Sequence, residues 1–191
     1  MLTVDCRNMA CPAPVIAVKK ALEHSSNLTV LLDDGAPREN VTRFCRNRGY
    51  HVSEEPFEGG KTLSISGTGN ATPSSGITLT YDCTLLIASD RLGDGPEDLG
   101  KLLMKNFIHT LLETPSQPAE ILFINSGVRL ACKDSDVIEA LEKLVGMGVE
   151  ISSCGLCLDF FSIREFLQVG SVTNMLTIAE TLLTRDRVVK L

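Results

Sequence analysis

The sequence contains no tryptophan and only two tyrosines among its 191 residues, so any hydrophobic core must be largely aliphatic. It also has no run of about 18 consecutive apolar residues, which a membrane-spanning helix would need. Its first residues lack the basic stretch and the apolar segment of a signal peptide, so we expect a cytoplasmic protein. The three histidines lie far apart and none adjoins a cysteine, which argues against a Cys–His protease site.

Basic side chains are in the minority, with 18 Lys and Arg against 24 Asp and Glu and a net charge of −6. Such a chain has no general attraction for nucleic acid or for an anionic membrane. With 43% hydrophobic and 22% charged residues, the composition is that of a globular protein. One local exception is a group of arginines on a predicted helix, which is either a solvated face or a docking surface for a partner protein: Arg38, Arg43, Arg46 and Arg48.

Cysteine is the abundant reactive residue, with seven copies at uneven spacing. An odd, unevenly spaced set does not resemble a secreted disulfide framework. In a reducing compartment, cysteines serve as buried packing residues, metal ligands or reactive thiols. The sequence therefore directs attention to thiol chemistry.

A small, polar segment at 67–79 predicts a flexible linker between a first domain at 1–66 and a second at 80–191. In the first domain, the residue pattern predicts the order βαβαββ, folded as a two-layer sandwich with both helices on one face of the sheet. The expected elements are strands at 2–5, 28–32, 50–54 and 62–65 and helices at 12–24 and 36–48.

In the second domain, the near-continuous apolar runs 84–88 and 121–124 predict central strands of a parallel sheet that is covered on both faces. Alternating helices and strands predict a doubly wound α/β fold. An amphipathic stripe is expected to mark the first helix of this domain: Leu99, Leu102, Leu103, Phe107 and Leu111. Further elements are expected at 137–145, 149–152, 159–168, 174–184 and 188–189.

Cys11 lies in the sequence Cys11-Pro12-Ala13-Pro14, between the first predicted strand and the first predicted helix. Proline is favoured in the first helical turn, so Pro12 and Pro14 indicate where the helix begins. A thiol at a helix N-terminus is favoured as the thiolate, which is nucleophilic and can carry sulfur as a persulfide. The alternative is a buried cysteine beside a helix start.

The segment 4–16, which includes Asp5, Arg7 and the Cys-Pro-x-Pro motif, resembles the opening of the TusA/SirA-like sulfur carriers. This resemblance extends over 1–66 and implies a βαβαββ fold in which Cys11 relays persulfide sulfur, with Asp5, Arg7, Pro12 and Pro14 supporting the motif. Family members usually carry glycine where this chain has Asn8. Asparagine tolerates the left-handed backbone region better than most residues, so the loop can be kept.

A second thiol motif, Cys154-Gly155-Leu156-Cys157, follows the predicted strand 149–152. The carboxyl ends of parallel strands form the usual ligand crevice, so polar loops after the other strands are expected beside it. This second-domain pocket is predicted to include Ser89, Asp90, Arg91, Asn125, Ser126, Gly127 and Asn174. Zinc would need further ligands at a suitable spacing, which are missing, so no metal is expected. A redox dithiol, a sulfur-handling pair and a buried structural pair remain open.

Residues 82–191 resemble the DsrE-like α/β proteins of sulfur relay, on the segments 89–93, 125–128, 154–158 and 169–175. The combination of the two domains resembles YedF-family proteins, which are described as selenium-metabolism proteins. These resemblances imply relay of sulfur, or of selenium, between a donor protein such as a cysteine desulfurase and an acceptor protein. They also allow a homo-oligomer through the second domain.

Our hypothesis is therefore a sulfurtransferase or carrier in which Cys11 accepts the chalcogen and Cys154 and Cys157 receive or reduce it. No cofactor is required, because the thiols themselves carry the chemistry. One alternative is a dithiol oxidoreductase centred on Cys154 and Cys157. Another is a non-enzymatic regulatory adaptor that binds partners through the arginine-rich helix.

Overall fold

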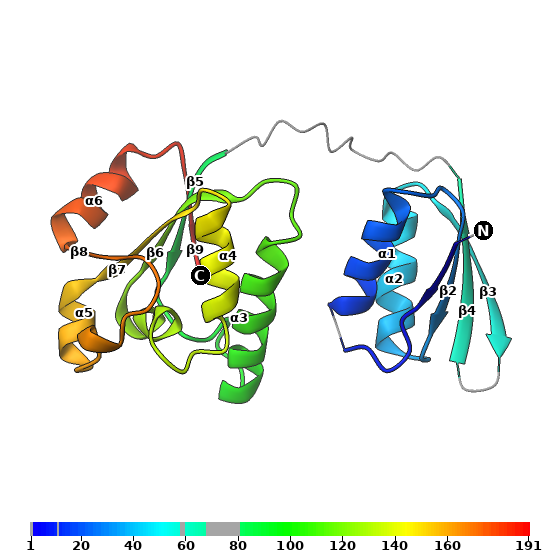
Figure 1. Cartoon of the computed structure of the whole chain (residues 1–191), viewed down its shortest axis with the longest axis horizontal. Helices are drawn as coiled ribbons and strands as arrows, with labels where there is room; N and C mark the ends of the chain where they lie inside the picture. The colour runs from blue at the N-terminus through cyan, green and yellow to red at the C-terminus, as the bar shows by residue number, and fades with distance from the viewer. Residues whose placement is uncertain (1, 11, 58–59, 68–80) are drawn as a thin grey trace. The chain divides into compact units, whose positions relative to one another are not determined.

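The computed structural model describes residues 2–10, 12–57, 60–67 and 81–191 (Figure 1). It separates into two compact units, Met1–Gly76 and Ile77–Leu191, and each unit has a hydrophobic core of its own. Apart from Gly67, the predicted linker 67–79 lies outside the described residues. The boundaries that we drew at 66 and 80 therefore stay predictions.

The first unit is a four-stranded sheet with two helices on one face (Figure 1). The strand order is β1-β2-β4-β3, with β1 parallel to β2 and the remaining pairs antiparallel. The elements are β1 (Leu2–Asp5), α1 (Ala13–Leu22), β2 (Leu28–Leu32), α2 (Ala36–Asn47), β3 (His51–Phe57) and β4 (Gly60–Ser66). This confirms the predicted βαβαββ two-layer fold.

Simple periodicity explains how this unit buries its core. In β2, the side chains at positions 28, 30 and 32 are buried while those between them are half-buried, because alternate residues of a strand point to opposite faces. On α2, Val41 and Cys45 lie one helical turn apart and both are fully buried. Gly49, with φ of +81°, follows the end of α2 in a conformation that glycine adopts without steric cost.

The second unit is a five-stranded, all-parallel sheet with the order β8-β7-β6-β5-β9. Figure 1 shows α3 and α4 on one side of this sheet and α5 and α6 on the other. The elements are β5 (Tyr81–Ile87), α3 (Glu97–Leu111), β6 (Pro118–Phe123), the 3₁₀ helix η1 (Asn125–Ala131), α4 (Ile138–Gly146), β7 (Glu150–Cys154), α5 (Gly155–Phe160), the 3₁₀ helix η2 (Arg164–Phe166), β8 (Ser171–Thr173), α6 (Met175–Thr184) and β9 (Arg187–Lys190). The predicted doubly wound α/β class is confirmed.

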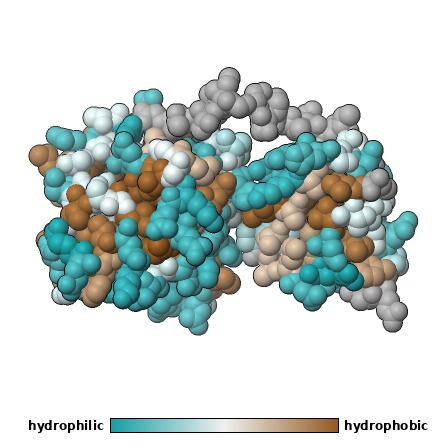
Figure 2. All heavy atoms as spheres, viewed as in Figure 1, coloured by the Kyte–Doolittle hydropathy of each residue, from teal (hydrophilic) through white to brown (hydrophobic). Residues whose placement is uncertain are grey.

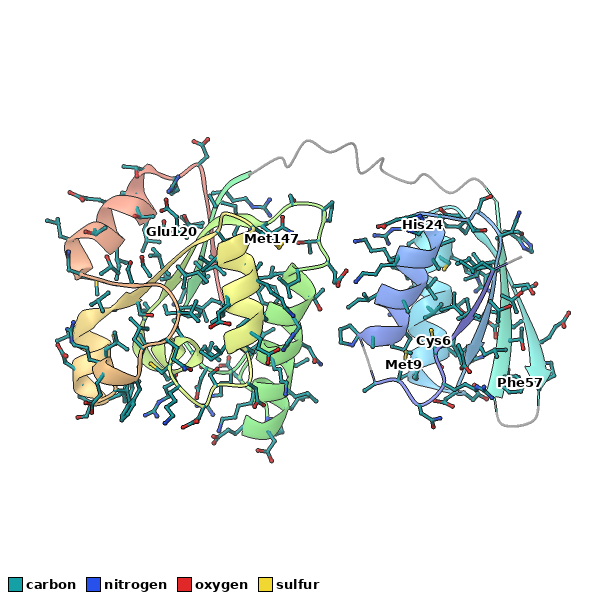
Figure 3. The ribbon with its side chains drawn as sticks, in the orientation of Figure 1. Cys6, Met9, His24, Phe57, Glu120 and Met147 are labelled. Carbon is teal, nitrogen blue, oxygen red and sulfur yellow. The ribbon has the colours of Figure 1, made fainter. Side chains whose placement is uncertain are left out.

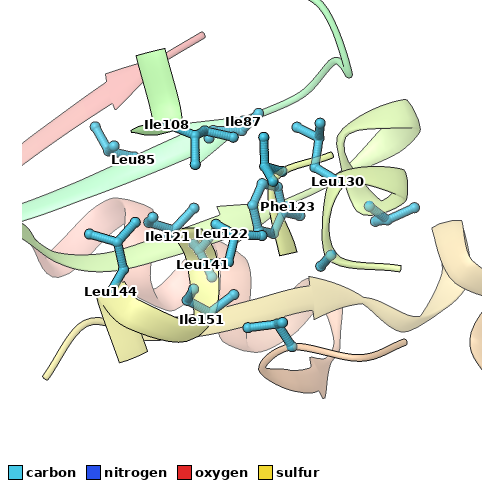
Figure 4. Close-up of a cluster of buried hydrophobic side chains, with 14 of the residues drawn as sticks. Leu85, Ile87, Ile108, Ile121, Leu122, Phe123, Leu130, Leu141, Leu144 and Ile151 are labelled. Atoms are coloured by element: carbon cyan, nitrogen blue, oxygen red, sulfur yellow. The ribbon is translucent and has the colours of Figure 1, made fainter. Parts of the chain in front are cut away.

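The core of the second unit is built around β6, the middle strand of the sheet (Figure 4). Ile121, Leu122 and Phe123 are each at most 1% exposed, so this strand is covered on both faces. Leu141 and Leu144 of α4 pack into the same cluster. Complete burial of an aliphatic side chain of this size contributes about 1.5–3 kcal/mol, so β6 holds the carboxyl edge of the sheet in place.

The face of α3 that enters the core agrees only in part with the stripe that we expected, because, of its five residues, Leu111 is buried and Phe107 packs against the core. The buried residues of α3 are Gly100, Met104, Ile108 and Leu111, whereas Leu99, Leu102 and Leu103 are 48%, 54% and 41% exposed. Apolar side chains therefore reach the surface of the unit among charged ones (Figure 2). In the part of the chain that the structure describes, no helix has both the length and the apolar character needed to cross a membrane.

The helix that we expected at about 159–168 is wrong in its bounds. The chain forms the earlier and shorter α5, which contains Cys157, and then η2. Ser162 has a φ of +56°, which lies outside the helical region and separates the two. The short elements η1 and β8 were also missed, because each is too brief to show periodicity in the sequence.

Candidate functional site

Cys11, the predicted carrier thiol, lies outside the described residues, but the chain on both sides of it is described. Helix α1 begins at Ala13, one residue later than predicted, with Pro12 as its N-cap and Pro14 buried in its first turn. The N–H of Ala13 donates to the carbonyl of Ala10 at 3.0 Å, and the N–H of Ile16 donates to the carbonyl of Pro12 at 3.2 Å. Pro12, Ala13 and Pro14 thus form the start of a helix, as we predicted.

The loop that leads to this motif is held by two carboxylates. Arg7 donates to Asp5 through Nε at 2.9 Å and through Nη2 at 2.5 Å, which is a bidentate ion pair. These bonds, with a further bond from the backbone N–H of Arg7, lower the pKa of Asp5 to about 2. The N–H of Asn8 donates to Asp33 Oδ2 at 2.6 Å, and Asn8 has a φ of +60°. Asp5 and Arg7 therefore stabilise the conformation of the loop.

Cys6 and Met9, which flank this loop, have opposite environments (Figure 3). Cys6 is fully buried, and burial, followed by the charge of Asp5, raises the pKa of its thiol. Met9 is 38% exposed. Cys6 is therefore a packing residue, in agreement with its position at the end of β1.

The two cysteines of the second unit lie at the carboxyl end of β7. Cys154 is the last residue of that strand and is fully buried, whereas Cys157 lies on α5 and is partly exposed. The backbone N–H of Asn125 donates to Cys157 Sγ at 3.1 Å. All six described cysteines are free thiols. The structure thus joins Asn125 and Cys157, two residues that we predicted to share a site.

Burial and two neighbouring residues, Asn125 and Cys154, set the pKa of the Cys157 thiol. Burial is the largest influence and raises the pKa of the Cys157 thiol, while the N–H of Asn125 acts to lower that pKa. The hydrogen bond and the charge of Cys154 raise the same pKa further, so the two thiols interact directly. Because the net shift is upward, Cys157 is mainly a protonated thiol at neutral pH.

The loops after β5 and β6 are connected to each other in the same corner of the sheet. Ser126 Oγ donates to Asp90 Oδ1 at 3.1 Å and accepts the N–H of Asp90 at 3.3 Å. The N–H of Arg91 donates to Ser89 Oγ at 3.2 Å, which closes a short turn. Because Asn125 and Ser126 are adjacent, this network lies directly beside the contact between Asn125 and Cys157.

Two of the predicted pocket residues, Gly127 and Asn174, shape the local backbone. A Cβ on Gly127 would lie 2.3 Å from the carbonyl oxygen of Ile87, so glycine is required for η1 to approach the end of β5. Asn174 caps α6, with its Oδ1 accepting the N–H of Thr177 at 3.1 Å. Among the described residues, no hydrogen bond joins Asn174 to either thiol, although Thr173, the residue before it, pairs with Cys154 across the sheet.

A cavity of about 540 Å³ lies on the α3 side of this corner. Of the seven predicted pocket residues, Asp90 lines it, while the other walls come from α3, η1 and the segment 133–137. Four basic side chains line the cavity together with three acidic ones: Lys101, Lys105, Arg129 and Lys133, with Asp90, Asp134 and Asp136. Polar residues therefore surround a hollow that our sequence interpretation missed, because they are distant in the sequence.

Arg164 and Arg129 hold α5 in place, and our sequence analysis predicted neither role. Arg164 forms a bidentate ion pair with Asp159 at 2.6 and 2.7 Å and donates to the carbonyl of Gly155 at 3.2 Å. The guanidinium of Arg129 lies 4.4 Å from the centroid of the Phe161 ring. The spacing between Asp159 and Arg164 is not a helical i, i+4 spacing, so no sequence pattern predicts the pair.

The remaining described cysteines have environments that favour packing. Cys45 is fully buried with a pKa raised to about 11, mainly by burial. Cys132 is 4% exposed, and its thiol donates to the carbonyl of Val128 at 3.3 Å. Cys83 is half-buried against the core. Over the described ranges, no group of three or more His, Cys, Asp and Glu side chains could hold a metal ion.

Two of the four arginines on α2 and at its C-cap form contacts within their own unit. Arg38 pairs with Asp34 and with Glu54, both at 3.1 Å. Arg48 lies over the ring of Phe44, with its guanidinium 3.9 Å from the ring centroid. Arg38 and Arg48 therefore have intramolecular partners. This leaves less of the arginine-rich surface for the partner protein that the adaptor hypothesis requires.

Comparison with known proteins identifies the first unit. The family model described as "Sulfurtransferase TusA" matches residues 2–66. The "Putative sulfur carrier protein NMA0882" of Neisseria meningitidis serogroup A is 37% identical over 51 residues, which are 25% of this chain and 69% of that protein. A second protein with the same type of name, NMB0681 of serogroup B, matches to the same extent.

Two solved structures are each similar to a part of this chain. The SirA-like protein of Desulfitobacterium hafniense is 30% identical and covers 36% of this chain and 100% of its own, with a TM-score of 0.32. The ychN protein from E. coli is 14% identical and covers 58% of this chain and 99% of its own, with a TM-score of 0.46. Because the family model matches residues 2–66 and the relatives are 37% identical over 51 residues, this chain belongs to the TusA sulfurtransferase family.

Proposed function

We propose that this chain is a persulfide-based carrier that relays sulfur from a donor protein to an acceptor protein, with Cys11 as the carrying thiol. The observation that carries the proposal is the family match over residues 2–66, which includes the Cys11-Pro12-Ala13-Pro14 motif. A thiolate attacks the terminal sulfur of a donor persulfide, accepts that sulfur, and releases the donor as a thiolate. The reaction uses no cofactor.

The second unit supplies the next thiols in this proposal. Cys154 and Cys157 interact directly at the carboxyl edge of a parallel sheet, beside the polar loops that carry Asp90 and Ser126. That edge is where open α/β sheets usually bind ligands. In the finer form of the proposal, the second unit is DsrE-like, the whole chain is YedF-like, and selenium replaces sulfur as Cys–S–Se⁻.

The test is the intact mass of the purified protein after incubation with a cysteine desulfurase and cysteine. We expect a gain of one sulfur atom that dithiothreitol removes, and loss of that gain in Cys11→Ser. Cys83→Ser is the matched control, because Cys83 lies half-buried against the core and should leave loading intact. Equal loading of wild type and Cys11→Ser would refute the role of Cys11.

One alternative function has an observation in its favour. The contact between Cys154 and Cys157 in a Cys-x-x-Cys spacing is typical of a dithiol oxidoreductase. Such an enzyme would retain activity in Cys11→Ser and lose it in Cys154→Ser, measured by reduction of a disulfide substrate. In the loading assay, by contrast, a sulfur carrier would lose loading in Cys11→Ser and retain it in Cys154→Ser.

A further inference from the structure

Cys154 and Cys157 differ in their access to a reactant. Cys154 is fully buried, so an incoming sulfur donor cannot reach it without opening the fold. Cys157 is partly exposed, and its neighbours on α5, Leu156 and Phe160, are 73% and 82% exposed. The surface around Cys157 is therefore open to a donor, and the buried Cys154 thiol is within hydrogen-bonding reach of Cys157.

The N–H of Asn125 is aimed at Cys157 and not at Cys154. Its distance of 3.1 Å to Cys157 Sγ is short for a hydrogen bond to sulfur. A donor that points at a sulfur atom favours the anionic form of that sulfur, and this N–H acts against the burial that raises the pKa of the Cys157 thiol. The thiolate is the form that attacks sulfur, so this N–H supports the reacting state.

Three consecutive residues hold this N–H in position. Asn125 has a φ of +50°, a region that asparagine adopts more readily than most residues. Ser126 is tied to Asp90 by two hydrogen bonds. Gly127 lies against the carbonyl of Ile87, where a Cβ would not fit. The donor is thus fixed by contacts on a rigid sheet edge before any sulfur arrives.

We propose that Cys157 is the thiol of the second unit that accepts sulfur, that Asn125 is its positioning residue, and that Cys154 then expels the sulfur as hydrosulfide. In the first step, the Cys157 thiolate attacks the terminal sulfur of a persulfide, the donor leaves as its thiolate, and Cys157 carries –S–SH. In the second step, the Cys154 thiolate attacks Cys157 Sγ, a Cys154–Cys157 disulfide forms, and HS⁻ leaves.

The two steps balance without an external oxidant. The transferred sulfur gains two electrons and becomes hydrosulfide, and the two cysteine sulfurs lose two electrons as they form the disulfide. A dithiol reductant then restores both thiols for the next cycle. This inference rests on the proposed function for the origin of the persulfide, but the chemistry of Cys154 and Cys157 can be tested apart from Cys11.

The experiment uses the full chain in a Cys11→Ser background with glutathione persulfide as the probe. We expect this protein to release sulfide and to form a Cys154–Cys157 disulfide, which peptide mapping detects. The additional change Cys154→Ser should stop disulfide formation and leave one extra sulfur on the peptide that contains Cys157. The additional change Cys157→Ser should remove both the released sulfide and the disulfide.

An extra sulfur on Cys154, or a disulfide that joins either cysteine to a different residue, overturns the inference. The outcome is separable from that for the proposed function. If Cys11 is loaded by the desulfurase while Cys157 never carries sulfur, the inference fails and the carrier role stands. If Cys157 reacts while Cys11 is never loaded, the carrier role of Cys11 fails and the inference about Cys157 stands.

The role of Asn125 is tested by the pH profile of Cys157 alkylation in two matched variants. Asn125→Gly keeps both the N–H and access to positive φ, so its profile should equal that of the wild type. Asn125→Val disfavours positive φ and should move the N–H away, which we expect to raise the pKa of the Cys157 thiol and to lower its alkylation rate at neutral pH about tenfold. Identical profiles for the folded Gly and Val variants would exclude Asn125 as a positioning residue.

Discussion

At the scale of the residue, asparagine in the left-handed backbone region occurs beside both thiol sites. Asn8 has a φ of +60° three positions before Cys11, and Asn125 has a φ of +50° in contact with Cys157. Each N–H has a definite acceptor, Asp33 in the first case and Cys157 in the second. Asn8 occupies the position at which the resembling carriers usually have glycine, and its conformation shows why asparagine can replace glycine there.

The loop before Cys11 should respond to acid through Asp5. Its folded pKa of about 2 lies below the ordinary value of 3.8, because Arg7 binds the ionised carboxylate. The stabilising contribution of this ion pair is therefore present above about pH 4 and is lost as the pH falls through 2. Titration of the Asp5 carboxyl by ¹³C NMR should give the low value, and Arg7→Gln should return it toward 3.8. A value near 3.8 in the wild type would contradict the ion pair.

Gly127 should tolerate no side chain. Its Cβ would lie 2.3 Å from the carbonyl oxygen of Ile87, a backbone atom that cannot move without displacing β5. We expect Gly127→Ala to lower the free energy of unfolding by about 1–3 kcal/mol, as overpacking does. Gly146 is the control, because it ends α4 with no atom near a new Cβ, and Gly146→Ala should stabilise by about 0.5–1 kcal/mol. Urea denaturation measures both, and equal effects would argue against the close contact.

At the scale of the element, the sequence predicted the strands and most helices because periodicity and apolar runs are local signals. It did not predict which face of α3 is buried, since apolar residues lie on more than one face of that helix. The choice is made by Gly100, whose Cβ would lie 2.9 Å from the Cβ of Arg91, so α3 packs closely along this side. Likewise, the Cys-x-x-Cys spacing was visible, but the Asn125 contact depends on η1, which shows no periodicity.

The buried face of α3 leads to a paired prediction. Met104 is fully buried and Leu102 is 54% exposed, although both are large apolar residues two positions apart. Met104→Ala should lower the free energy of unfolding by about 2–5 kcal/mol, because it leaves a cavity in the core. Leu102→Ala should change it by no more than about 0.5 kcal/mol, as surface substitutions do. Chemical denaturation of the two variants measures both effects. If the stripe expected from the sequence formed the core, Leu102→Ala would be the more destabilising substitution.

At the scale of the whole molecule, the residues that the structure describes form two hydrophobic clusters that share no residue. One lies within the first unit and the other within the second. The family match covers only the first, at 2–66, and the proposed second-unit chemistry belongs entirely to the other. A cluster of this kind is the basis of cooperative unfolding, so separate clusters indicate that each unit can lose its structure by itself.

This independence is testable by hydrogen exchange with mass spectrometry, which reports protection for peptides of each unit. Leu63 and Ile121 are both fully buried, one in each cluster, and truncation of either to alanine should cost about 2–5 kcal/mol. We expect Leu63→Ala to reduce protection only in peptides of the first unit and Ile121→Ala only in peptides of the second, because neither side chain contributes to the other core. If either substitution lowered protection throughout the chain to the same degree, the two units would form one cooperative structure, and the thiols of the second unit could not be assayed independently of the carrier domain.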